Sequence, residues 1–82
     1  KYMATLRFLP AIAKEISQQQ WHPKQAGYWQ GEDYVLIIPY ADERELTQDI
    51  LRYTPHVLVE APSTLHQSVL AKLEAAIKAY ST

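Results

Sequence analysis

The sequence predicts an α+β domain built on one antiparallel sheet, and three observations favour this class. Residues 2–9 alternate in character, as a strand with one buried side does. Residues 25–40 hold two runs of strand-forming side chains around a turn. Two later stretches, before Pro55 and after Pro62, place apolar side chains at helical spacing. The 82 residues are enough for one domain, with a modest margin of stability.

The first half of the chain is predicted to form a strand, a short helix and a hairpin. Pro10 suits a first helical turn, and apolar side chains four residues apart predict a helix over 11–20. Strands over 25–30 and 33–40 flank Gly31-Glu32 as a hairpin. The strand over 2–9 has two faces, with Ala4, Leu6 and Phe8 on one and Met3, Thr5, Arg7 and Leu9 on the other.

The second half is predicted to add a helix, a strand and a last helix. Asp42 followed three residues later by Glu45 is an acidic variant of the capping box and predicts a helix over 43–53. Residues 56–61 form a short β-branched stretch that Pro62 ends. Ser63 or Thr64 then caps a helix with an apolar stripe made of Leu65, Val69, Leu73, Ile77 and Tyr80.

The predicted order of elements is β-α-β-β-α-β-α. Right-handed crossovers fold the first six elements most simply into a ferredoxin-like sandwich with sheet order 4-1-3-2, to which the C-terminal helix is an addition. Both crossover helices then cover one sheet face, so the other meets water, the last helix or a partner. The side chains expected there include Met3, Arg7, Ile37 and Leu58, which is too apolar a set for a fully solvated face.

The composition excludes several kinds of partner and site. Eight Lys and Arg against nine Asp and Glu give a formal charge of −1, which removes the broad basic field of a domain that grips nucleic acid by its phosphates. The absence of cysteine excludes disulfides and thiolate zinc sites and fits a reducing compartment. The apolar run over 34–40 is far too short to cross a bilayer, and the N-terminus does not resemble a signal peptide, so a soluble chain is expected.

No catalytic, metal or cofactor site is predicted. The three histidines, His22, His56 and His66, lack metal-ligand spacing and have no cysteine to complete a zinc set. The carboxylates over 42–45 are interpreted as helix capping rather than acid–base groups, and no glycine elbow marks a serine or threonine nucleophile.

Two functions that occur on the same topology are also disfavoured. An acylphosphatase needs an anion-cradling loop with an arginine after the first strand, where this chain has Leu9-Pro10-Ala11. An RNA-recognition domain stacks bases on strand aromatics beside basic residues. The strand over 33–40 offers Tyr34 and Tyr40 but carries no Lys or Arg and follows an acidic turn.

Four side chains remain as candidates for contact with a ligand or partner: Arg7, Lys24, Arg52 and His66. A solvated surface is the simpler explanation for each. Arg7 is the first choice, because a guanidinium in the middle of an apolar-leaning strand face suits bidentate contact with a carboxylate or phosphate. Trp21 and Pro23 are unusual for a linker, and Pro23 pushes His22 towards an extended conformation, so this segment is interpreted as a shaped approach to the next strand.

Several short motifs follow one another along the chain: Leu6-Arg7-Phe8, Trp21-His22-Pro23-Lys24-Gln25, Tyr40-Ala41-Asp42 with Glu45-Leu46, Ile50-Leu51, Pro55-His56-Val57, and Ala61-Pro62 before Leu65. In this order they form a pattern that resembles the C-terminal extension, called WCX, of bacterial WYL-domain transcriptional regulators. The pattern covers nearly all of residues 1–82, which we interpret as a single WCX-like domain. Because the chain starts at Lys1 without an initiator Met, we expect it to be a fragment of a longer regulator.

The resemblance implies a non-enzymatic module, without a cofactor, of a cytoplasmic regulator. In that family a winged-helix DNA-binding domain and a WYL domain precede the extension, and the WYL domain senses a ligand that in several members is a nucleic acid or a nucleotide-like signal. The extension is then expected to help form a homodimer, to contact the preceding WYL domain and to relay or complete the sensing site. DNA would be contacted only through the missing N-terminal domain, and no membrane is involved.

By the same resemblance, Arg7 faces the ligand or the neighbouring WYL domain, while Trp21, Pro23 and Gln25 shape the approach to the second strand. Asp42, Pro55 and Pro62 are structural motif positions. Two residues depart from the pattern. Thr54 replaces a glycine before Pro55, which puts the tight turn in question because a β-branched residue resists positive φ. His66 replaces an arginine, which weakens an anion site at that helix start.

Two competing interpretations stay open. The first is a stand-alone ferredoxin-like domain that binds a small molecule at a dimer interface. The second, weaker one is an acylphosphatase-like enzyme.

Overall fold

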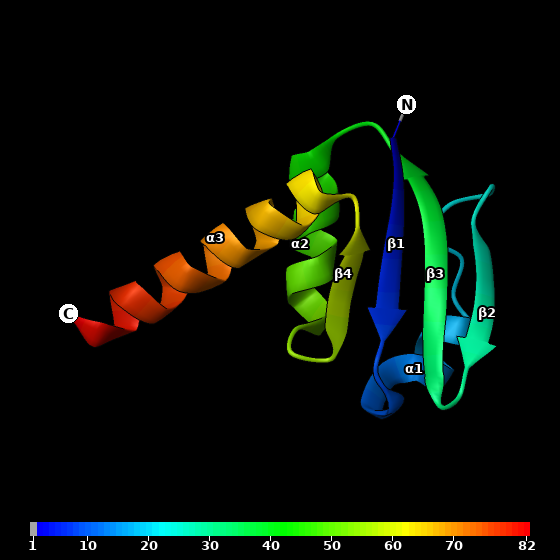
Figure 1. Cartoon of the computed structure of the whole chain (residues 1–82). Helices are drawn as coiled ribbons and strands as arrows, with labels where there is room; N and C mark the ends of the chain where they lie inside the picture. Colours follow the sequence, from blue (N-terminus) through cyan, green and yellow to red (C-terminus); the bar gives the residue numbers. More distant parts are fainter. Residues whose placement is uncertain (1) are drawn as a thin grey trace.

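The computed structural model of the chain describes residues 2–82 and has an α+β architecture (Figure 1). All strand pairs are antiparallel, and the sheet order is β2-β3-β1-β4, which is 4-1-3-2 when read from the β4 edge. The predicted α+β class and antiparallel sheet are therefore confirmed. The elements are β1 (Tyr2–Phe8), α1 (Pro10–Ser17), β2 (Ala26–Gln30), β3 (Asp33–Tyr40), α2 (Glu43–Tyr53), β4 (Val57–Ala61) and α3 (Ser63–Ser81).

One face of the sheet is buried under the helices. Leu6 pairs with Leu36 and Ala4 pairs with Ile38, so the predicted inward face of β1 continues across β3. Ile16 of α1, Ile50 of α2 and Leu65 of α3 are fully buried in the same core. The alternation in β1 is thus confirmed, and the burial of these side chains is the main source of stability.

The boundaries of α1 and α3 differ from the sequence prediction. Helix α1 ends at Ser17 instead of residue 20, because the Gln19 carbonyl and side chain bond to the following segment. Helix α3 has Pro62 as its N-cap, with the His66 N–H donating to the Pro62 carbonyl at 3.1 Å. A cap at Ser63 or Thr64 would start the helix one or two residues later. The predicted hydroxyl cap is therefore wrong.

The turns on either side of α2 use side-chain oxygens. Asp42 is the predicted N-cap, and its carboxylate accepts from the Arg44 N–H at 2.9 Å. Thr54 has φ −62°, and its hydroxyl donates to the Ile50 carbonyl at 3.1 Å. The turn before Pro55 therefore requires no glycine and no positive φ, so the difficulty expected from Thr54 does not arise. The peptide bonds before Pro55 and Pro62 are cis.

The β2–β3 hairpin is confirmed with Gly31 and Glu32 as its loop. Gln30 pairs with Asp33 across the turn, and Gly31 has φ +61°. A left-handed conformation at the first loop position is one that glycine adopts at little cost.

Among residues 2–82 no helix packs on the second sheet face, which we call the open face (Figure 1). Arg7 lies beside Leu58 in the register, and Thr5 lies beside Ile37, so the predicted set of Met3, Arg7, Ile37 and Leu58 shares this face. The exposed fractions of the large apolar residues here are 53% for Met3 and 50% for Leu58. Helix α3 packs on the opposite face and leaves this one uncovered.

Helix α3 is anchored only in its first half. Figure 1 shows that it leaves the sheet beside β4 and ends far from every other element. Ile77 and Tyr80, which belong to the predicted apolar stripe, are 67% and 94% exposed. None of the helices formed by residues 2–82 is both long and apolar enough to span a bilayer.

Candidate functional site

The segment between α1 and β2 is held in one conformation by the side chain of Gln25. Its amide oxygen accepts from the backbone N–H groups of Trp21, at 2.6 Å, and His22, at 3.1 Å, and its amide nitrogen donates to the Gln19 carbonyl at 3.0 Å. The Lys24 N–H donates to the His22 Nδ1 at 3.0 Å. A stretch without regular secondary structure thus satisfies its backbone groups through side chains.

This conformation places the Trp21 ring between β1 and the end of α2. Its centroid lies 5.6 Å from that of Phe8 in an edge-to-face arrangement and 5.7 Å from that of Tyr53. The indole N–H donates to the Gln19 amide oxygen at 3.0 Å. The interpretation of Trp21 as part of a shaped approach to β2 agrees with this packing, and one edge of its ring faces a groove.

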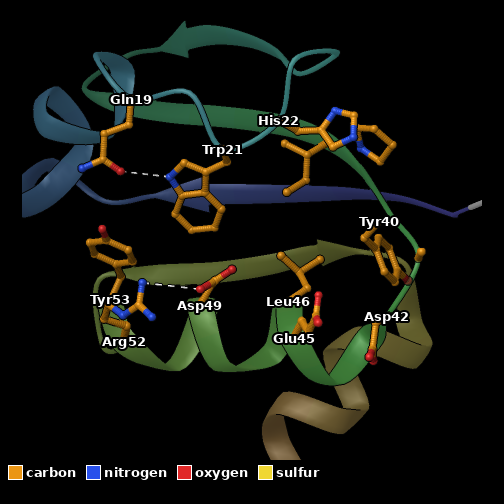
Figure 2. Close-up of a pocket in the computed structure, with 13 residues that line it drawn as sticks. Gln19, Trp21, His22, Tyr40, Asp42, Glu45, Leu46, Asp49, Arg52 and Tyr53 are labelled. Atoms are coloured by element: carbon orange, nitrogen blue, oxygen red, sulfur yellow. Dashed lines mark hydrogen bonds and ion pairs between the residues drawn. The ribbon is translucent and has the colours of Figure 1, made fainter.

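The groove lies between α2 and the Gln19–His22 segment, over the end of β3, and has a volume of about 540 Å³ (Figure 2). We call it the α2 groove. Its lining residues are Gln19, Trp21, His22, Ile38, Pro39, Tyr40, Ala41, Asp42, Glu45, Leu46, Asp49, Arg52 and Tyr53.

One wall of the α2 groove is acidic. Asp42, Glu45 and Asp49 follow one another at spacings of three and four, so they share one side of α2. Arg52 continues this row, and its guanidinium lies 3.4 Å from the Asp49 carboxylate. The wall therefore carries three carboxylates and one guanidinium above an apolar floor.

Tyr40 lies at the end of the groove beside its acidic wall. Its ring centroid is 5.6 Å from that of Tyr2. Burial raises the pKa of the Tyr40 phenol above its ordinary value, and the nearby Glu43 and Tyr2 raise it further. The neutral phenol is therefore the form that the fold favours.

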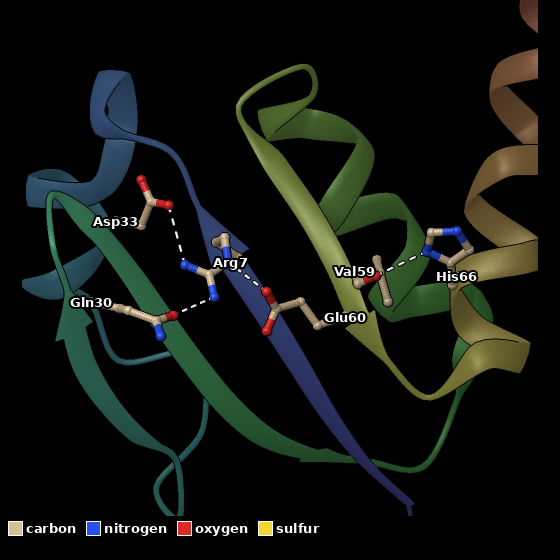
Figure 3. Close-up of polar contacts among 6 residues, drawn as sticks. All are labelled: Arg7, Gln30, Asp33, Val59, Glu60 and His66. Atoms are coloured by element: carbon tan, nitrogen blue, oxygen red, sulfur yellow. Dashed lines mark hydrogen bonds and ion pairs between the residues drawn. The ribbon is translucent and has the colours of Figure 1, made fainter.

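A second polar cluster occupies the open face around Arg7 (Figure 3). The Arg7 guanidinium donates to Glu60 at 2.5 Å, to Asp33 at 3.2 Å and to the Gln30 amide oxygen. These contacts raise the pKa of Arg7, with the Glu60 hydrogen bond as the largest cause. Arg7 is thus bound by side chains of three other strands.

Glu60 lies at an irregularity in the pairing of β4 with β1. The pairing of β1 with β4 joins Leu6 to Val59 and Thr5 to Ala61, so the register shifts at Glu60. Such a bulge re-aims a side chain. It could not be recognised from the sequence, because Glu60 simply continues an alternating strand pattern.

The structure does not bring the four predicted contact residues together. Arg7 lies on the open face, Arg52 lies in the α2 groove, and Lys24 is exposed in the segment before β2. The Nδ1 of His66 lies 2.9 Å from the Val59 carbonyl, so this nitrogen carries a proton and donates. Among residues 2–82 no hydrogen bond or ion pair joins any two of the four, and no three His, Asp or Glu side chains converge as a metal site would require.

The α2 groove was missed by the sequence analysis, although part of its signal is visible there. The acidic row on α2 includes Asp42 and Glu45, which were interpreted only as capping residues. The shortness of α1 could not be predicted, because Gln18, Gln19 and Gln20 are compatible with helix.

A protein-family model described as the WCX domain matches residues 1–77. No curated protein matches the chain.

Proposed function

Because this chain belongs to the WCX domain family, we propose that it is the self-association and effector-response module of a bacterial DNA-binding transcriptional regulator with a WYL domain. In this proposal the module catalyses no reaction and needs no cofactor. The preceding WYL domain carries the sensing site for a nucleotide or nucleic-acid effector, and a winged-helix domain carries the contacts to DNA. The observation that carries the proposal is the family match over nearly the whole chain.

The uncovered apolar surfaces support a role in contacts. The open face exposes Met3, Leu58 and Tyr28, and the far half of α3 exposes Ile77 and Tyr80. A domain of this size has little core to spare, so large exposed apolar side chains in two places favour burial against other protein surfaces. The fold we propose is ferredoxin-like, which the element order and the strand order support.

The contacts of Arg7 refine its proposed role. Its guanidinium is already bonded to Glu60, Asp33 and Gln30, so an anionic effector would have to displace side chains of the same chain. We propose that Arg7 orders the open face for the neighbouring WYL domain, and that the effector binds mainly to that domain.

The proposal is tested with the complete regulator. The full open reading frame is expected to encode a winged helix and a WYL domain upstream of residues 1–82. Deletion of residues 1–82 should abolish dimerisation, measured by sedimentation, and the effector-induced change in operator affinity. A deletion variant that still dimerises and still responds to effector would contradict the proposal.

The alternative is a stand-alone domain that binds a small molecule, and the α2 groove is the observation that favours it. A groove of about 540 Å³ with aromatic and polar walls is of the size that small ligands occupy. An open reading frame that encodes only this domain would favour the alternative over the regulator.

A further inference from the structure

The α2 groove is bounded by two walls and a floor, as a docking site for a helix is. Helix α2 forms one wall, the Gln19–His22 segment forms the other, and the end of β3 forms the floor. A groove with an apolar floor and polar walls binds the apolar stripe of an amphipathic helix.

The chain itself holds a helix with an uncovered apolar stripe. We call residues 70–81 the α3 arm. Leu70, Ile77 and Tyr80 of this arm are 38%, 67% and 94% exposed. Leu73 still packs on the core, and the turns beyond it have no packing. About two turns of helix without packing are marginally stable in water, so contact with another surface would stabilise both the helix and its apolar side chains.

The arm cannot enter the groove of its own chain. Leu65 and Val69 are buried in the core, and the Ser68 hydroxyl donates to the Glu43 carboxylate at 2.8 Å, which fixes the first half of α3 on α2. From this anchor the helix points away from the sheet (Figure 1). The arm is therefore available only to a second molecule.

We propose that two copies of this chain exchange their α3 arms, each arm lying in the α2 groove of the other copy. The inference rests on the self-association in the proposed function and names the surfaces that make it. A two-fold axis repeats every arm–groove contact, so one dimer covers the α3 arm and the α2 groove of both copies.

Charge complementarity favours a second copy as the occupant. The arm carries Lys72, Glu74 and Lys78, with a formal charge of +1. The acidic wall of the groove, made of Asp42, Glu45, Asp49 and Arg52, has a formal charge of −2. Lysines that flank an apolar stripe would reach these carboxylates when the stripe lies on the groove floor.

Burial of the exposed apolar side chains of the arm would favour the contact. Ile77, Tyr80 and their neighbours present on the order of 300 Å² of apolar surface on each arm.

Cross-linking of single-cysteine variants tests the contact, and the natural absence of cysteine makes the background clean. An equimolar mixture of Glu45→Cys and Ile77→Cys is treated with a short bismaleimide. The expected result is a cross-linked heterodimer, with much less product from either variant alone or from a mixture of Met3→Cys and Ile77→Cys. Cross-linking through Met3→Cys alone, without product from the Glu45 and Ile77 pair, would overturn the inference.

Sedimentation separates the inference from the proposed function. Ile77→Asp is expected to weaken dimerisation at least tenfold, while Leu58→Asp on the open face leaves it unchanged; circular dichroism checks that both variants fold. Lys78→Glu should also weaken the dimer, and Glu45→Lys in the same chain should restore it. A dimer lost in Leu58→Asp and kept in Ile77→Asp overturns arm exchange but keeps self-association, whereas a parent chain that is monomeric at all concentrations overturns both.

Discussion

Gln25 shows how one polar side chain can fix a segment that has no regular secondary structure. Its amide bonds to three backbone groups, of Gln19, Trp21 and His22, so the chain reverses between α1 and β2 without buried unpaired donors. The order Trp-His-Pro-Lys-Gln therefore has a structural reason. The tryptophan supplies the packing, and the glutamine fixes the backbone that carries it.

Replacement of Trp21 by alanine is expected to destabilise the domain by about 2 kcal/mol, because the ring packs on Phe8 and Tyr53 but is only partly buried. Urea unfolding followed by circular dichroism measures the change. The matched control is Trp29→Ala, since Trp29 is 51% exposed on the edge strand and should cost less than Trp21. Equal losses from the two variants would contradict the packing role.

The raised pKa of the Tyr40 phenol predicts that the stability of the domain depends on pH in the alkaline range. Burial raises the pKa of the folded phenol above 10.0, so the unfolded chain loses this proton first as the pH rises. The contribution of Tyr40 is complete below pH 10 and declines above it. Tyr40→Phe is therefore expected to lose stability less steeply than the parent above pH 10 in urea titrations. Identical slopes for Tyr40→Phe and the parent would refute the prediction.

At the scale of the elements, the strands and α2 could be predicted because their signals are local. The alternation in β1, the glycine turn at 31–32 and the Asp42 cap all operate within a few residues, and the structure contains each of them. The end of α1 coincides with bonds from Trp21 and Gln25 to Gln19, and Glu60 at the bulge bonds to Arg7, which is 53 residues away in sequence. Such side-chain contacts leave no periodic trace in the sequence.

Gly27 of the edge strand β2 lies against the ring of Tyr34. A Cβ there would lie 2.9 Å from the Cε2 of Tyr34 and closer still to its hydroxyl, because the Tyr34 ring covers the glycine. Gly27→Ala is expected to destabilise the domain by about 1–2 kcal/mol in urea unfolding. Tyr34→Leu in the same chain should remove most of this added cost. The control is Gly31→Ala, whose cost comes from φ +61° and should persist when Tyr34 is changed.

At the scale of the whole molecule, a formal charge of −1 conceals a separation of charge. The carboxylates of the groove wall and the lysines of the α3 arm lie on different parts of the chain, and they meet only when two copies exchange arms. The open face has a different character, since Met3 and Leu58 flank an Arg7 whose charge is compensated by Asp33 and Glu60. The salt dependence of dimerisation therefore distinguishes contact through the arms and grooves from contact through the open face.

Dimerisation through arms and grooves is expected to weaken several-fold between about 50 and 500 mM sodium chloride, because salt screens contacts between exposed charges. Sedimentation equilibrium across this range measures the dissociation constant. Lys72→Gln with Lys78→Gln should give a weaker dimer with a flatter salt dependence. An association that strengthens with salt would indicate apolar contact through the open face instead.

The exposed second half of α3 has a consequence for how sequences of this family can be sorted. A relative whose last helix ends soon after its buried first half has no arm to offer to a second copy. Such a relative also gains nothing from a row of carboxylates along the outer side of α2. The hydrophobicity of the C-terminal turns and the charge of that row should therefore vary together among these domains, so that a sequence alone would tell self-sufficient members from those that are completed by a second chain.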